Sequence, residues 1–207
     1  MVLVGLILSI QPCLAACDSI PTFAEGRAPI RELHVATTGS DHSGDGTPAQ
    51  PFATICAASR EATLGTAIVV HAGTYSGGCA IYDLHGRAAA PIWIGGADGE
   101  PMPVIDGGSQ GLHIIRGRYL ILHDFEVRNS LDNGINCDDG GDVADPDAAR
   151  YLIFDNLYIH DIGGSGNQDG LKLSGVDDFW VLNSTFARCG GGYSGSGIDQ
   201  VGCHQGV

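Results

Sequence analysis

The stretch GINCD at residues 134–138 has three counterparts in the chain: GLHII at 111–115, GLKLS at 170–174 and GIDQV at 197–201. Each begins with glycine and then alternates apolar and polar residues, which is the period of a half-buried β-strand. The four glycines lie 23, 36 and 27 residues apart. Repeats of roughly 20 to 50 residues indicate a solenoid or an array of stacked units.

A second segment follows each of the first three repeats: YLILHDFEV at 119–127, YLIFDNLYI at 151–159 and FWVLNSTFA at 179–187. Each contains two short apolar strands around a polar pair, so one unit holds three strands. Such a unit buries its apolar face only when neighbouring units stack on it. We therefore predict an all-β fold, a parallel β-helix over residues 33–207.

Polar residues recur between the second and third strands of each unit. Asp124, Asn156 and Ser184 are predicted to form a ladder of side-chain hydrogen bonds at one corner of the stack. A short α-helix is expected from about Phe52 to Ala62, where it would cover the open N-terminal edge of the sheet. Because little sequence follows the last repeat, we expect the solenoid to be incomplete at its C-terminal end.

The first 16 residues form an apolar run that ends in small residues and carries no charge. They are typical of a secretory signal, and the apolar core is too short to span a membrane. The junction LAAC at 14–17 resembles a lipoprotein box, so a lipid anchor at Cys17 is the alternative to ordinary cleavage. Residues 17–32 are then a leader, and the mature protein is expected to be secreted or on the cell surface.

Cysteine usage agrees with export. Without Cys13 the chain keeps an even six cysteines, which permits three disulfides without fixing their pairing. These are Cys17, Cys56, Cys79, Cys137, Cys189 and Cys203. No CxxC spacing occurs, so a cysteine-bound metal is not predicted.

The net charge is −14, from 24 acidic residues against nine arginines and a single lysine, Lys172. This balance excludes a basic face for nucleic acid. A polyanionic substrate would need a local cation or a few arginines.

Strand alternation places the residue two positions after each repeat glycine on the outer face. Stacking then yields one column, whose members are His113, Asn136, Lys172 and Asp199. We predict Asn136, Asp199 and His113 as substrate-binding residues beside Lys172. An outward lysine next to an aspartate is also a common surface salt bridge.

Two further clusters carry candidate chemistry. Arg128, His160 and Arg188 follow equivalent third strands and are predicted to stack as a basic column, with His160 as an alternative base. Asp138, Asp139 and Asp142 begin an acidic stretch, and such oxygen-rich clusters suit calcium. The alternative for this stretch is a solvated acidic loop.

The segments HVATTGSDHSGDGTPAQPFATI (34–55) and GTAIVVHAGTY (65–75) resemble the opening of secreted right-handed parallel β-helix proteins. Many members of this group are lyases that act on pectate, alginate or related uronans. The resemblance covers residues 33–207 and implies a right-handed β-helix that acts on polysaccharide. The Asp138-Asp139-x-x-Asp142 spacing is similar to the calcium cluster of family-9 pectate lyases, whose base is a lysine.

Elimination from a uronan needs a base that removes the proton beside the carboxylate of the sugar. It also needs a group that neutralises that carboxylate. The hypothesis is a calcium-assisted polyuronate lyase with Lys172 as base and Arg188 or Arg128 as neutralising residue. One alternative is a glycoside hydrolase with paired carboxylates, for which Asp169, Asp199 and the pair Asp177-Asp178 are available. The other is a non-catalytic module for glycan binding or surface adhesion.

Overall fold

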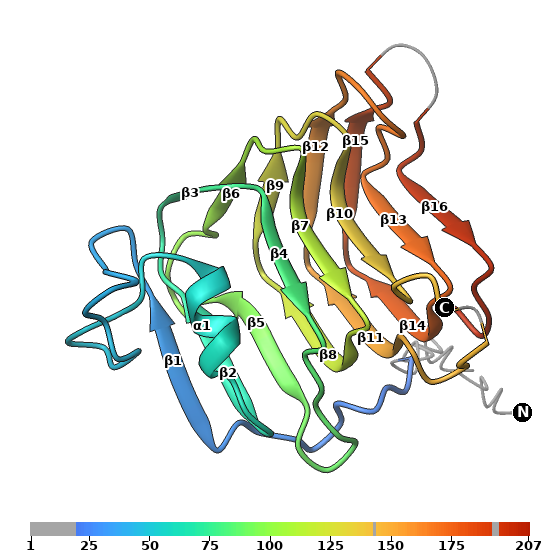
Figure 1. Cartoon of the computed structure of the whole chain (residues 1–207). Helices are drawn as coiled ribbons and strands as arrows, with labels where there is room; N and C mark the ends of the chain where they lie inside the picture. The colour runs from blue at the N-terminus through green and yellow to red at the C-terminus, as the bar shows by residue number, and fades with distance from the viewer. Residues whose placement is uncertain (1–19, 143, 192–194) are drawn as a thin grey trace, which may run out of the picture.

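The computed structural model describes residues 20–142, 144–191 and 195–207. Its strands form three parallel sheets along one elongated stack (Figure 1). Sheet A has the order β1-β2-β5-β8-β11-β14, sheet B the order β3-β6-β9-β12-β15, and sheet C the order β4-β7-β10-β13-β16. From β2 onward each coil contributes one strand to A, one to B and one to C. The predicted right-handed parallel β-helix is confirmed.

The first two coils follow the entry strand β1 and the helix α1. The bounds are β1 Arg31–Val35, α1 Ile55–Glu61, β2 Thr66–Val70, β3 Thr74–Ser76, β4 Cys79–Tyr82, β5 Ile92–Gly96, β6 Val104–Asp106 and β7 Gln110–Ile115. The remaining coils contain β8 Arg118–His123, β9 Glu126–Arg128, β10 Asn133–Asp138, β11 Arg150–Asp155, β12 Tyr158–Ile162, β13 Leu171–Ser174, β14 Asp177–Leu182, β15 Thr185–Cys189 and β16 Ile198–Val201.

Side chains that alternate inward from all three sheets fill the interior. On β8, Leu120 and Leu122 are fully buried in the core, and Phe154 on β11 occupies the same layer. Burial of a large apolar side chain contributes about 1.5–3 kcal/mol. The alternating pattern that predicts the strands is therefore also the pattern that makes the core.

The predicted helix is shorter than expected and does not pair the open edge. Thr54 is its N-cap, and Thr54 Oγ1 accepts a hydrogen bond from the Ala57 amide at 3.1 Å. Phe52 lies outside the helix because its backbone pairs with β1, donating to His34 O and accepting from Ala36 N. The loop around Phe52 thus satisfies the edge of β1, while α1 packs against β1, β2 and β4.

In the corner column Asn183, and not Ser184, lies opposite Asn156, and Asn183 Nδ2 donates to Asp155 Oδ1 at 2.7 Å. Asp124, Asn156 and Asn183 all adopt a left-handed backbone conformation, with φ of 55°, 51° and 49°. Asn156 Nδ2 donates to Asp124 Oδ1 at 2.6 Å. Because Asp155 pairs with Leu182, the next residue, Asn183, continues the column. Short polar side chains tolerate this conformation, so the ladder is structural.

The leader lies along the outside of sheet A. In Figure 1 it runs back along the stack from beside β14 to β1. The Phe23 ring packs edge-on against Tyr119, Tyr151 and Trp180, with ring centroids 5.5, 6.2 and 5.7 Å away. These three residues belong to β8, β11 and β14, so the leader bridges three coils. The predicted signal peptide and Cys17 lie outside the described residues.

One disulfide is present in the described part of the chain, between Cys56 on α1 and Cys79 on β4. Cys137, Cys189 and Cys203 are free, and Cys137 is fully buried. Among the described residues, one of the three disulfides that the cysteine count permits is therefore formed.

We expect the double variant Cys56→Ser/Cys79→Ser to lose about 3 kcal/mol of unfolding free energy, because the bond closes a loop of 23 residues in the unfolded chain. Urea denaturation followed by circular dichroism measures the loss. Cys203→Ser is the control and should change stability far less. Equal stability of the double variant and the wild type would contradict the prediction.

Candidate functional site

The predicted outward column on sheet C is confirmed. His113 pairs with Asn136, Asn136 with Lys172, and Lys172 with Asp199, on the successive strands β7, β10, β13 and β16. Neighbouring strands of a sheet lie about 4.8 Å apart, so the four side chains form one polar strip along the stack. The alternation of the repeats fixes this register, because a shift by one residue would turn the apolar residues outward.

Lys172 lies between two carboxylates. Its Nζ atom is ion-paired with Asp199 and lies 4.0 Å from Asp169 Oδ2. The Lys172 side chain is only 12% exposed and that of Asp169 only 5%, whereas that of Asp199 is 37% exposed. Burial raises the pKa of Asp169, even though its Oδ1 accepts a hydrogen bond from the Ser196 amide at 2.8 Å. The cluster therefore combines a shielded lysine, a partly exposed aspartate and a buried aspartate whose pKa is raised.

A second group adjoins this cluster on the same strip. Asp138 Oδ2 lies 2.5 Å from His113 Nε2 and accepts from Asn136 Nδ2 at 3.2 Å. Burial alone would raise the pKa of Asp138, but hydrogen bonds from His113 and the Gly140 amide bring that pKa below its usual value. Asn136 Oδ1 is buried and has no hydrogen-bond partner among the described residues. It is an acceptor that a bound ligand could satisfy.

The His113–Asp138 contact was not predicted, because strand alternation aligns only residues that lie directly opposite each other. The two residues belong to neighbouring strands and are offset by two positions, since Asn136 is the direct partner of His113. Diagonal neighbours of this kind still interact when their side chains are long. This offset is the signal that could have found the pair. His113 also borders a cavity of about 270 Å³ together with Ser109 and Gln110.

The acidic stretch does not form a preorganised cation site. Asp139 is 7% exposed, and its Oδ1 accepts the Gly141 amide at 2.8 Å, whereas Asp138 faces the polar strip. Ile115, the partner of Asp138 on the preceding coil, is apolar. Among the described residues, no three His, Cys, Asp or Glu side chains are grouped so as to hold a metal ion. Calcium takes six to eight oxygens, so Asp138, Asp139 and Asp142 do not fit it as arranged.

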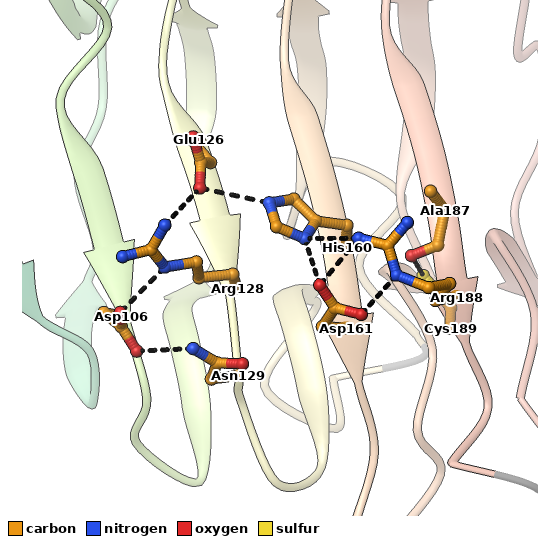
Figure 2. A network of polar contacts seen from close by, with 9 residues as sticks. All are labelled: Asp106, Glu126, Arg128, Asn129, His160, Asp161, Ala187, Arg188 and Cys189. Atoms are coloured by element: carbon orange, nitrogen blue, oxygen red, sulfur yellow. Dashed lines mark hydrogen bonds and ion pairs between the residues drawn. The ribbon is translucent and has the colours of Figure 1, made fainter.

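The basic residues lie on sheet B and not beside Lys172 (Figure 2). Arg128 pairs with His160 as predicted, but the next partner of His160 is Ala187, so Arg188 is displaced by one position. Arg188 Nη2 donates to Asp161 Oδ2 at 2.7 Å and also lies 3.2 Å from His160 Nδ1. Hydrogen bonds from Arg188 and His160 hold the pKa of Asp161 well below its usual range.

The rest of this network on sheet B is also paired. Arg128 donates to Asp106 at 2.8 Å and to Glu126 at 3.0 Å, and Glu126 Oε1 also lies 3.0 Å from His160 Nε2. Figure 2 shows these acidic side chains in contact with the two arginines and His160 across neighbouring strands. Opposite charges on neighbouring strands stabilise a sheet face, and Arg128 and Arg188 each have a carboxylate partner on this one.

The four aspartates proposed for a hydrolase do not lie together in the structure. Asp177 and Asp178 begin β14 on sheet A, where Asp178 bonds to Arg150 at 2.5 Å and Asp177 to His204 at 2.8 Å. Only Asp169 and Asp199 come together, with Lys172 between them.

Comparison with known proteins supports the fold. No protein-family model and no curated protein matches the chain. Among solved structures, pectate lyase Pel9A matches with a TM-score of 0.63 and 21% identity, over 86% of this chain and 48% of that one. A GH136 lacto-N-biosidase from Eubacterium ramulus matches with a TM-score of 0.61 and 17% identity, over 77% of this chain and 34% of that one.

An alginate lyase from Paenibacillus sp. str. FPU-7 matches with a TM-score of 0.55 and 21% identity, over 75% of this chain and 44% of that one. The chain thus spans less than half the length of these three proteins. At such identities the likeness shows the β-helix fold and leaves the activity to be argued from the site. In the described part of the chain, no helix has the length and apolarity to cross a bilayer.

Proposed function

We propose that this chain acts on an extracellular acidic polysaccharide and cleaves it by β-elimination at the cluster of Lys172, Asp169 and Asp199. The observation that carries the proposal is the position of Lys172. The single lysine lies in the middle of the outward polar strip on sheet C, largely shielded from water. Two of the matched solved structures are named as lyases of such polymers.

A lysine acts as a base only in its neutral form, and two neighbouring carboxylates favour the ammonium. Both carboxylates can stop stabilising the ammonium form of Lys172. Burial raises the pKa of Asp169, which shifts this carboxyl toward its neutral form, and we propose that the more exposed Asp199 turns to solvent when a substrate binds. Lys172 would then remain in a shielded site without a counter-charge, which favours the neutral amine.

In the elimination, Lys172 Nζ takes the proton on the carbon next to the uronate carboxylate. The electron pair of that C–H bond forms the new double bond as the glycosidic oxygen leaves, and this oxygen takes a proton from water. Asn136 and His113 lie on the same strip and supply hydrogen-bonding groups for the substrate. Donors fixed beside developing charge are a large source of rate enhancement.

A hydrolase is the second candidate, because Asp169 and Asp199 have different environments. The buried Asp169 has a raised pKa, which suits a general acid, while Asp199 is more exposed and ion-paired with Lys172. Pairs of carboxyl groups whose pKa values are pushed apart are typical of glycosidases. In that case Asp169→Asn should abolish turnover, and the products should have saturated ends.

The test is turnover on a panel of pectate, alginate and glycosaminoglycans, read as the ultraviolet absorbance of unsaturated ends. We expect absorbance to grow with at least one uronan. We expect the rate with a chelator to stay within about twofold of the rate with calcium, because the acidic stretch does not converge on a cation. Full dependence on calcium would contradict this and show that the acidic loop rearranges. If no polysaccharide of the panel is cleaved, the proposal of an enzyme is wrong and the glycan-binding module is favoured.

A further inference from the structure

A column of outward apolar residues on sheet A is covered over only part of its length. Trp93, Ile121, Ile153 and Trp180 pair with one another across β5, β8, β11 and β14. Ile121 and Ile153 point away from the core cluster, yet they are only 6% and 3% exposed. Phe23 of the leader packs on Trp180 and on the tyrosines beside this column. The leader therefore occupies the C-terminal part of the column.

The N-terminal part of the column is open. Trp93 borders a cavity of about 260 Å³, and Pro29 of the leader forms part of its wall. Gly95 and Gly96 lie beside Trp93 on β5 and also line the cavity. A Cβ atom on Gly95 would lie 2.4 Å from the His123 ring, so the ring fits at this position only because residue 95 is a glycine. A partly exposed tryptophan, a histidine and two glycines thus meet in one cavity, beside the β2 residues Ala67 and Val69.

The polar groups around this cavity are hydrogen-bond acceptors. Glu32 and Asp98 line it, and the Glu32 side chain is 58% exposed. His123 Nδ1 lies 2.7 Å from Asp124 Oδ2, so with the proton on Nδ1 the Nε2 atom is an acceptor facing the floor. Sugar hydroxyls donate to such acceptors, and sugar C–H groups pack on the negative face of an aromatic ring. Two carboxylates at the rim repel a uronate.

We propose that the cavity at Trp93 is a binding subsite for one uncharged pyranose unit of a polysaccharide, separate from the Lys172 cluster. Its volume is below the roughly 300–1,000 Å³ of sites for drug-sized ligands, which suits a single ring. Trp93 stacks on the sugar, and Glu32, Asp98 and His123 accept from its hydroxyls. The proposed uronate-cleaving site and this subsite lie on different sheets. A negative result for one proposal therefore does not affect the other.

The two tryptophans of the chain allow a direct test. In the variant Trp180→Phe, Trp93 is the only tryptophan, and its fluorescence is followed during titration with neutral xylo-, manno-, cello- and galacto-oligosaccharides. We expect a saturable change with at least one of them, with a dissociation constant on the order of 1 mM, as a ligand of about a dozen heavy atoms gives. Oligogalacturonate should bind at least about tenfold more weakly, because of the two rim carboxylates.

The matched control is Trp93→Phe, in which the remaining Trp180 lies under Phe23 and should report no saturable change. Trp93→Ala should also lose retardation in native gels that contain the sugar polymer, while its circular dichroism stays that of the wild type. The proposal is overturned if the Trp180→Phe variant shows no saturable change at tens of millimolar sugar. Equal binding of oligogalacturonate, or an equal response in Trp93→Phe, would also overturn it.

Discussion

Replacing Lys172 with arginine should lower turnover on the cleaved polysaccharide by roughly 10²–10⁴-fold, the usual contribution of a general base. Arginine keeps the positive charge and can keep the ion pair to Asp199, but a guanidinium does not release its proton at working pH. The variant therefore removes proton transfer and leaves the charge in place. Initial rates of ultraviolet absorbance, together with unchanged circular dichroism, measure the effect.

Lys172→Ala is the companion variant, because it removes both the base and the charge. If both variants lose activity to a similar degree, proton transfer is the function of the lysine. Retention of more than about a third of the wild-type rate by Lys172→Arg would contradict the base assignment. Lys172 would then serve as a fixed charge that holds Asp199 and the substrate.

The second large effect is expected for Gly134→Ala, which should lower the unfolding free energy by roughly 3 kcal/mol, at the upper end of the cost of overpacking. The repeat glycines stack on one another at the start of each strand of sheet C. A Cβ atom on Gly134 would lie 2.5 Å from Gly170 O and 2.6 Å from Ile159 Cγ2. Both contacts are with groups fixed by the sheet or the core, so the backbone itself must move.

The same column supplies the control. A Cβ on Gly197 would meet only Phe186, at 3.2 Å, because no described coil follows it. Gly197→Ala should therefore cost less than about 1 kcal/mol, because the mild contact with Phe186 is offset by the smaller backbone entropy that alanine loses on folding. Urea denaturation of both variants tests the pair. Equal destabilisation would show that the contact between coils is not the reason for the repeat glycine.

The fold was predictable because one pattern decides it. The alternation after each repeat glycine defines both the inward face and the strand register, so the column through His113, Asn136, Lys172 and Asp199 follows directly. The same pattern does not show at which strand ends the pairing with the next coil shifts by one residue. This is why Arg188 and Ser184 were assigned to the wrong columns.

The site was predictable only in part, because its contacts depend on side-chain length and on loops. The sequence placed Lys172 beside Asp199, but the approach of Asp169 depends on the corner loop before β13. The acidic run of Asp138, Asp139 and Asp142 has the composition of a calcium site. Burial of Asp139 and the turn of Asp138 toward His113 separate the carboxylates, and composition does not contain that information.

The most direct test of the central claim is cleavage of a uronan by the full 207-residue chain in ¹⁸O-labelled water, with products analysed by mass spectrometry at early times. Elimination at Lys172 leaves the glycosidic oxygen on the departing fragment. The account therefore predicts unsaturated ends and no label, measured before the reducing ends exchange spontaneously. One labelled oxygen per broken bond, with saturated ends, would contradict it and assign the chemistry to hydrolysis by Asp169 and Asp199.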